Sequence, residues 1–132
     1  MRISAIDHVV LPVDDAEAAI RFYTEVLGLE GVRLEEFRAG RAGFASARVG
    51  GALLDLMPTE RPERLDHVCL RVAAPIESVV AELEGAGVAL VTGPVRRYGA
   101  EGDGMSVYVR DPAGNTLELK SAAGAAATGE RR

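Results

Sequence analysis

The sequence predicts an α+β fold built from two copies of a βαβββ unit that are related by pseudo-twofold symmetry. The first observation is an internal repeat, because residues 6–13 read closely like residues 65–72 at an offset of 59 positions. The second is that residues 51–56 resemble residues 114–119, at an offset of 63. The third is that a helical pattern follows the first strand-like run of each copy. Two copies are too few for a solenoid, so a duplicated unit is the simplest interpretation.

The first unit is expected to open with a strand at residues 6–13, a β-branched run of alternating polarity. A helix should follow at 15–27, because Asp14 or Asp15 can cap it and apolar residues recur at helical spacing. Gly28 stands where a glycine that ends a helix belongs. Three strands are then expected at about 32–38, 42–49 and 52–57, with a Gly-Gly turn joining the last two.

The second unit repeats this order. A strand is expected at 66–72 and a helix at 75–85, with Pro75 at the first helical position. The glycine-rich, charged segment 96–104 is interpreted as a mobile loop. Asp-Pro-Ala-Gly-Asn at 111–115 is a strong turn. The remaining strands are expected at about 88–95, 104–110 and 116–120.

The domain organisation follows from these elements. Residues 1–121 are expected to form one domain, with the first unit at about 3–57 and the second at about 65–121. Residues 58–64 carry two prolines and several charges, which is typical of a linker. The small, polar residues 122–132 are expected to be a disordered tail.

The composition excludes several functional classes. The chain has 132 residues, 48% of them hydrophobic, and a net charge of -5, which argues against nucleic-acid or anionic-membrane partners. The single cysteine, Cys69, excludes an internal disulfide and a CxxC zinc site, and it is expected to be a core thiol on the face opposite His67. The chain has no apolar run of about 20 residues and no secretory signal, so a cytoplasmic protein is expected.

The two histidines are the chain's only ones, and they occupy equivalent positions in the repeat. His8 and His67 are each third in the first strand of their unit, and Asp55 and Glu118 are equivalent in the last strand. Each acid lies between two leucines, where burying a carboxylate is costly unless it is paired or bound to a metal. If each sheet curls into half a cup, these four side chains can converge.

This set of side chains is typical of a metal site, although simpler interpretations remain open. Two imidazoles and one carboxylate hold non-haem Fe(II), and two of each suit Zn(II), Ni(II), Co(II) or Mn(II). A single strand histidine is more often structural, and Asp55 or Glu118 could face solvent on an edge strand. Tyr98, Tyr108 and Arg96 are further candidates for binding a substrate, although Tyr108 alone would more commonly be a packing residue.

Four stretches together resemble the vicinal oxygen chelate superfamily, which includes glyoxalase I, extradiol dioxygenases, fosfomycin-resistance enzymes and bleomycin-resistance proteins. The stretches are residues 6–13, 18–29, 65–68 and 111–119. The resemblance implies paired βαβββ modules that form a cupped mixed β-sheet around one divalent ion (Ni, Zn, Co, Mn or Fe). It matches His8, His67 and Glu118 to three ligand positions and Asp55 to a fourth, where Glu or Gln is usual. A homodimer is also implied, with modules that pair within one chain or between two.

The function that this resemblance favours is a metal-dependent, glyoxalase-like lyase or isomerase acting on a small oxygen-bearing molecule. In this interpretation Asp55 or Glu118 moves a proton as the general base. One alternative is an Fe(II) extradiol-type dioxygenase, although no third histidine remains for acid–base work. Further alternatives are a thiol transferase of the fosfomycin-resistance type and a metal-free protein that binds a small ligand.

Overall fold

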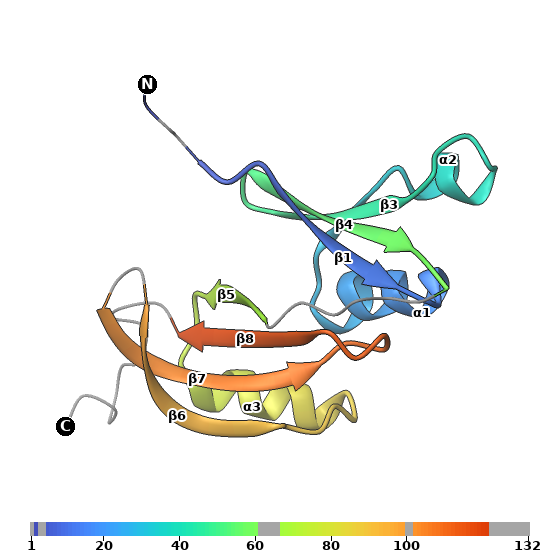
Figure 1. The fold of residues 1–132 in the computed structure, drawn as a ribbon. Coiled ribbons are helices and arrows are strands. Elements are labelled where there is room, and N and C mark those ends of the chain that lie inside the picture. Colours follow the sequence, from blue (N-terminus) through green and yellow to red (C-terminus); the bar gives the residue numbers. More distant parts are fainter. Residues whose placement is uncertain (1, 3–4, 61–66, 100–101, 122–132) are drawn as a thin grey trace. The chain divides into compact units, whose positions relative to one another are not determined.

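The computed structural model describes residues 2, 5–60, 67–99 and 102–121. The chain divides into two compact units (Figure 1). Unit 1 comprises Met1–Leu65 and Asp111–Asn115, and unit 2 comprises Asp66–Arg110 and Thr116–Arg132. Each unit contains one four-stranded mixed sheet, which confirms the α+β class and the duplicated architecture. The predicted tail at 122–132 and most of the predicted linker at 58–64 lie outside the described residues.

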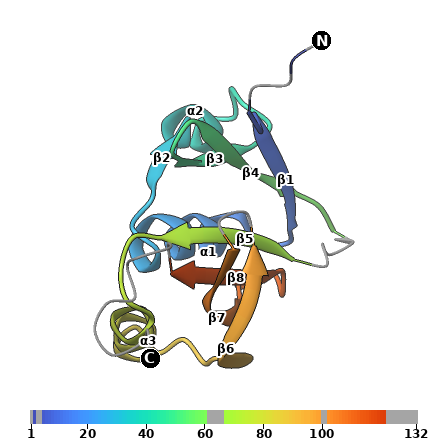
Figure 2. The same cartoon turned by 90° about the vertical axis from the view of Figure 1, so that its left-hand side faces the viewer.

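In unit 1 the sheet has the order β1-β4-β3-β2, with β1 parallel to β4 and the other pairs antiparallel. Helix α1 packs against β3 and β4, and the short helix α2 lies against β3 (Figure 2). The elements are β1 (His8–Val13), α1 (Ala16–Arg21), the π-helical turn η1 (Phe22–Val26), β2 (Glu30–Val32), α2 (Leu34–Arg38), β3 (Ala45–Val49) and β4 (Ala52–Pro58).

The predicted helix at 15–27 forms, but as two segments. Asp15 caps α1, because its Oδ1 accepts a hydrogen bond from the backbone N–H of Ala18 at 3.0 Å. The following turn, η1, is π-helical, and Gly28 then adopts φ +72°, which ends the helix as predicted. The core of the unit lies between these helices and the sheet, and its buried side chains include Leu11, Val13, Ile20, Tyr23, Leu54 and Leu56.

Unit 2 repeats the topology with the order β5-β8-β7-β6, and its helix α3 packs against β7 and β8 (Figure 1). Its apolar core lies under this helix, and includes Ile76, Val79, Leu83, Val107, Val109, Leu117 and Leu119. The elements are β5 (Val68–Val72), α3 (Ile76–Gly85), β6 (Thr92–Gly99), β7 (Gly102–Arg110) and β8 (Thr116–Ser121).

Two predicted elements are wrong. Residues 32–38 are not one strand, because Arg33 takes a left-handed φ of 63° and α2 begins at the next residue. The described residues of the predicted loop at 96–104, which are 96–99 and 102–104, belong to β6 and β7, where Arg97 pairs with Gly104. The glycines suggested mobility in the sequence, but Gly102 and Gly104 pair with Gly99 and Arg97 across the hairpin.

The turn at 111–115 has the predicted conformation and is also anchored in unit 1. Asp111 Oδ1 accepts from the backbone N–H groups of Ala113 and Asn115, at 3.0 and 2.8 Å. Its Oδ2 accepts from Tyr23 Oη at 2.8 Å and from Asn115 Nδ2 at 3.0 Å. Asn115 Nδ2 also donates to the carbonyl of Pro12 at 2.9 Å. Tyr23, Asp111 and Asn115 are all buried, and burial followed by the charge of Asp111 raises the pKa of Tyr23.

Candidate functional site

Alternation along β4 and β8 turns the two predicted carboxylates away from the leucines that contact the core. We call the surface of each sheet that bears Asp55 in unit 1, or Glu118 in unit 2, its carboxylate face. The register is the same in both units, because Val10 of β1 pairs with Asp55 and Cys69 of β5 pairs with Glu118. The duplicated scaffold therefore holds the two acids at equivalent places.

In unit 2, Glu118 and His67 form a close pair. Glu118 is 5% exposed, its Oε2 accepts from Ser106 Oγ at 2.8 Å, and its Oε1 lies 3.3 Å from His67 Nε2. Tyr108 is directly opposite Glu118 in the β7–β8 register. Its ring meets the His67 ring edge to face, with centroids 5.9 Å apart. The carboxylate is thus held by a hydroxyl on one oxygen, while the other faces the imidazole.

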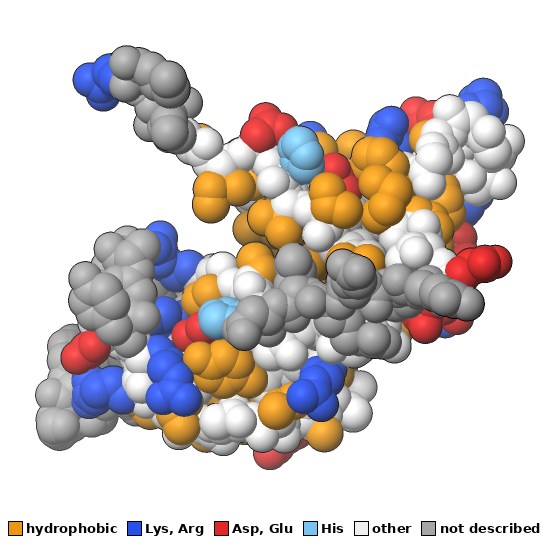
Figure 3. Space-filling view, in the orientation of Figure 1, with side chains coloured by type: hydrophobic (Ala, Val, Ile, Leu, Met, Phe, Trp, Pro, Cys, Tyr) orange, Lys and Arg blue, Asp and Glu red, His pale blue; other side chains and the backbone are white. Residues whose placement is uncertain are grey.

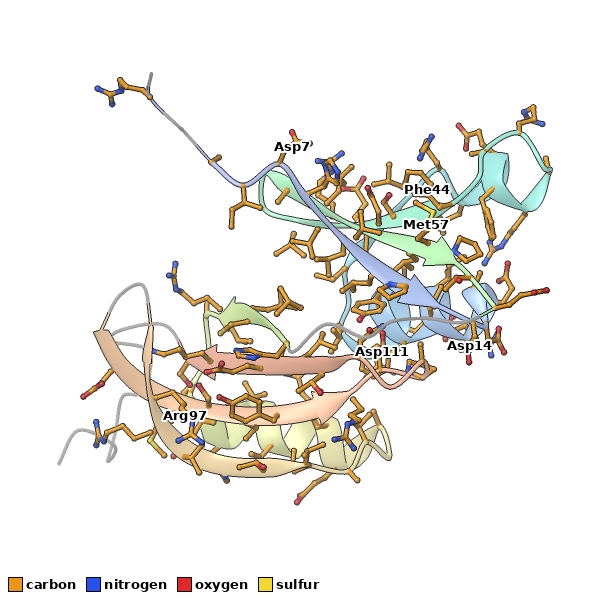
Figure 4. All side chains as sticks on the ribbon, viewed as in Figure 1. Asp7, Asp14, Phe44, Met57, Arg97 and Asp111 are labelled. Carbon is orange, nitrogen blue, oxygen red and sulfur yellow. The ribbon has the colours of Figure 1, made fainter. Side chains whose placement is uncertain are left out.

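The predicted substrate-binding residues have different positions around this pair. Arg97 Nε donates to Tyr108 Oη at 3.1 Å, and its guanidinium lies 5.6 Å from the centre of that ring. Arg96 alternates with Arg97 along β6, so the pleat turns it toward the other side of the sheet. Tyr98 belongs to β6, but its side chain lies outside the described part of the structure. Arg97 (labelled in Figure 4), and not the predicted Arg96, therefore has the position beside Tyr108.

In unit 1, Asp55 and His8 form the corresponding pair. Asp55 is 6% exposed, its Oδ1 accepts from Ser46 Oγ at 2.6 Å, and its Oδ2 lies 3.9 Å from His8 Nε2. His8 Nδ1 lies 2.8 Å from Asp7 Oδ2. The hydrogen bond that His8 donates to Asp7, followed by the charge of Asp55, raises the pKa of His8 above its usual value. When Nδ1 carries the proton and donates a hydrogen bond to Asp7, the imidazole is neutral, and its Nε2 has the lone pair that can bind a metal.

Sequence reasoning missed both serines, although one was within reach. The predicted Gly-Gly turn pairs Val49 with Ala52, and this register puts Ser46 directly opposite Asp55. Ser106 differs, because it pairs with Lys120 and reaches Glu118 diagonally. The turn between β7 and β8 has no length that fixes the register from the sequence. The contact between Ser106 and Glu118 could therefore be found only in the three-dimensional structure.

Distances between the donor atoms test whether a metal fits. With metal–ligand bonds of about 2.1 Å, two donors on one ion lie roughly 3.0–3.4 Å apart at octahedral or tetrahedral angles. The 3.3 Å between His67 and Glu118 meets this range, whereas the 3.9 Å between His8 and Asp55 exceeds it. Nowhere in residues 2, 5–60, 67–99 and 102–121 do three His, Cys, Asp or Glu side chains gather closely enough to hold an ion. Each unit therefore supplies one histidine and one carboxylate, which are two of the donors that a metal site needs. The spacing of the pair in unit 2 suits a shared ion better than the spacing in unit 1.

Cys69 is not the core thiol that the sequence predicted. It is exposed, and it lies on the carboxylate face because it is two residues from His67 and pairs with Glu118. Strand side chains alternate with a period of two, so residues 67 and 69 share a face. Partial burial of the sulfur, followed by the charge of Glu118, raises the pKa of Cys69 to about 11. The side chain is therefore a neutral thiol near pH 7.

Comparison with known proteins assigns the chain to a family. The family model described as the Glyoxalase/Bleomycin resistance protein/Dioxygenase superfamily matches residues 5–119. The chain belongs to this superfamily. The match covers both units and the His and carboxylate positions of each, so the resemblance inferred from the four sequence stretches is confirmed. Within the described residues, no helix is both long and apolar enough to cross a membrane.

Several known proteins resemble the chain over nearly its whole length. Virulence protein STM3117 of Salmonella typhimurium is 39% identical over 122 residues, which cover 90% of this chain and 85% of that protein. Its crystal structure matches with a TM-score of 0.77, covering 92% of this chain and 98% of that one. Glyoxalase domain-containing protein RDO1 of Mycosarcoma maydis is 30% identical, covering 92% of this chain and 70% of that protein. The structure of lactoylglutathione lyase from Agrobacterium tumefaciens is 25% identical with a TM-score of 0.68, covering 92% and 96% of the two chains.

Proposed function

We propose that this member of the Glyoxalase superfamily is a divalent-metal-dependent lyase or isomerase of the glyoxalase type that acts on a small oxygen-bearing molecule. The observation that supports the proposal most is the duplicated half-site, in which a histidine lies near a buried carboxylate that accepts a serine hydroxyl. A carboxylate buried in mid-strand is costly, and its recurrence at the same register in both units indicates a shared role.

The ligands in this proposal are His8, His67 and Glu118, with Asp55 as a fourth ligand or as the general base. We infer that residues 1–121 act as one domain and that the two half-sites complete one centre, either within one chain or in a homodimer. A bound divalent ion (Ni, Zn, Co, Mn or Fe) would polarise a substrate carbonyl and stabilise the negative charge that develops on its oxygen.

Asp55 is the better candidate for moving a proton. Ser46 occupies its Oδ1 at 2.6 Å, and its Oδ2 is directed toward His8 at 3.9 Å, which is long for a shared ligand pair. Its carboxylate can therefore take a proton from a substrate carbon and return it to the neighbouring one, as an isomerase requires. Glu118, at chelating distance from His67, is the better ligand.

An extradiol-type dioxygenase is the second candidate, and one observation favours it. His8, His67 and Glu118 form the two-histidine, one-carboxylate set that binds Fe(II). No third histidine is present, but the Tyr108 ring meets His67 edge to face and offers a phenol for proton transfer. Two assays separate the candidates. Isomerisation of the methylglyoxal–glutathione adduct by the Ni- or Zn-loaded protein would support the lyase. Oxygen uptake with catechol and Fe(II) would support the dioxygenase and overturn the lyase.

Substitution of Asp55 separates its two candidate roles. Asp55→Ala is expected to keep metal affinity within about threefold of wild type, because its oxygen is poorly spaced from His8, while turnover falls at least about a hundredfold. Isothermal titration with Zn(II) and the adduct assay measure the two quantities. The matched control is Asp14→Ala, which removes an exposed carboxylate outside both half-sites (Figure 4) and should change neither. A large loss of metal affinity in Asp55→Ala would instead make Asp55 a ligand.

A further inference from the structure

Each carboxylate face has a histidine and an acid at equivalent positions, but several of the neighbouring side chains differ in polarity between the two units. The common register makes Met57 of unit 1 equivalent to Lys120 of unit 2, since each lies two residues beyond its carboxylate. The same register makes Pro12 equivalent to Arg71, because these residues pair with Met57 and Lys120. Two more apolar residues of unit 1 have polar counterparts: Leu53 corresponds to Thr116, and Phe44, just before β3, to Ser106.

In unit 1 this exchange leaves apolar side chains next to Asp55, and the cation that shares this face, Arg48, is paired with Glu30 at 3.5 Å. Phe44 and Met57 lie beside each other on this face (Figure 4), and both are half-buried. The space-filling view shows several apolar side chains beside the histidine and acid of unit 1, together with some Lys or Arg atoms (Figure 3). In unit 2 the same view shows Lys and Arg side chains next to the histidine and acid (Figure 3).

Two cations of unit 2, Lys120 and Arg97, are both neighbours of Gly104 in the sheet. Lys120 is only 7% exposed, and a Cβ atom added at Gly104 would lie 2.8 Å from its Nζ. Because Gly104 has no side chain, there is room beside it for the ammonium group of Lys120. Arg97 pairs directly with Gly104 across the β6–β7 hairpin, so both cations belong to the same part of the sheet. The guanidinium of Arg97 is held by Tyr108, because Arg97 Nε donates a 3.1 Å hydrogen bond to Tyr108 Oη.

The charge of this face is opposite to that of the whole chain. The chain carries a net charge of -5, yet Lys120, Arg97 and Arg71 lie on this face, and among its described strand residues only Glu118 is acidic. A local excess of positive charge on a protein surface attracts anions. Guanidinium and ammonium groups bind carboxylate and phosphonate oxygens through charge-assisted hydrogen bonds.

We propose that the substrate carries an oxyanion group, a carboxylate or a phosphonate, and that Lys120 and Arg97 bind this group on the carboxylate face of unit 2. This inference rests on the proposed function, since it names the substrate class of the same site. Lys120 supplies a buried point charge. Arg97 is held in place because its Nε donates to Tyr108 Oη and its Nη1 donates to the Arg96 carbonyl, and its Nη2 is the donor offered to the anion. Lys120 and Arg97 are thus specificity residues outside the metal-binding set.

The test measures anion binding to protein freed of metal by dialysis against EDTA. Benzoate, phenylphosphonate and neutral benzyl alcohol are titrated into it, with binding followed by NMR shifts and calorimetry. Both anions are expected to bind at least about tenfold more tightly than the alcohol. Whichever anion binds more tightly identifies the group that the face recognises. Lys120→Met, which introduces the residue found at the equivalent position of unit 1, and Arg97→Gln should each weaken anion binding about tenfold or more.

Controls keep the inference separable from folding and from the metal site. Arg38→Gln removes one positive charge from an exposed pair with Glu17 in unit 1 and should leave anion binding unchanged. If Lys120→Met does not fold, Gly104→Ala provides a second variant, because its new Cβ must displace the ammonium group. His8→Ala should retain anion binding even though it loses a proposed metal ligand, so the two proposals fail separately. Anion affinity that is equal in wild type and in folded Arg97→Gln and Lys120→Met would overturn the inference.

Discussion

Replacing His67 with alanine is expected to lower the affinity for Zn(II) or Ni(II) by at least about a hundredfold, since each of the three proposed ligands, His8, His67 and Glu118, contributes a large share of the binding free energy. His67 Nε2 and Glu118 Oε1 lie 3.3 Å apart, which is the spacing of two donors on one ion. Removing the imidazole leaves Glu118 as the only donor of this pair. Isothermal titration of metal-free protein measures the loss.

Ser106→Ala is the matched comparison, because it removes a hydroxyl from the other oxygen of Glu118 while keeping every proposed ligand. Loss of a group that orients a ligand typically reduces metal affinity about tenfold, so this variant should fall between wild type and His67→Ala. Near-infrared or visible spectra of the Co(II)-loaded proteins report the coordination directly. Undiminished metal affinity in a folded His67→Ala protein would remove His67 from the ligand set.

Replacing Asp111 with alanine is expected to lower the free energy of unfolding by about 3–5 kcal/mol, because buried donors lose a shared charged acceptor. The carboxylate accepts hydrogen bonds from Tyr23 Oη, from Asn115 Nδ2 and from the N–H groups of Ala113 and Asn115. All of these contacts lie inside unit 1, although the turn itself joins two strands of unit 2. Urea unfolding followed by circular dichroism measures the change.

Two variants help to apportion this effect. Tyr23→Phe removes only the hydroxyl, so it should cost about 1–2 kcal/mol, less than the loss of the shared acceptor. Asp14→Ala removes an exposed carboxylate and should stay within about 0.5 kcal/mol of wild type. A stability for Asp111→Ala equal to that of Asp14→Ala would show that the buried network contributes nothing to folding.

The features that the sequence predicted correctly were local or repeated. The sequence predicted the equivalence of His8 with His67, and of Asp55 with Glu118, because the same residue pattern occurs in both units. The structure brings these residues together in pairs within each unit. The contact of Tyr23 with Asp111 was out of reach, because it joins residues far apart in the chain and nothing in either local pattern indicates it.

The incorrect predictions also have physical causes. Residues 32–38 alternate enough to suggest a strand, but the left-handed Arg33 starts α2 instead, and its guanidinium lies 4.6 Å from the centre of the Phe44 ring. The glycines of the β6–β7 hairpin suggested a loop, whereas Gly104 makes room for Lys120. Cys69 was assigned to the wrong face, although the period-two alternation of a strand was sufficient to assign it correctly.

The contrast between the two carboxylate faces illustrates why register matters. Met57 and Lys120 are each two residues from an acid in the sequence, but their equivalence acquires meaning only when both strands are paired. The repeat preserved the residues proposed to bind metal and diversified those around them.

The most direct test of the account is the metal content of protein purified without chelator, measured by elemental analysis for wild type, His8→Ala and His67→Ala. The account predicts about one divalent ion per chain in wild type and little in either variant, because a ligand set that has lost one of its two histidines cannot retain an ion. Metal should also raise the melting temperature of the wild type alone. Wild-type protein that neither contains nor is stabilised by a divalent ion, or variants that keep the full metal content, would contradict it.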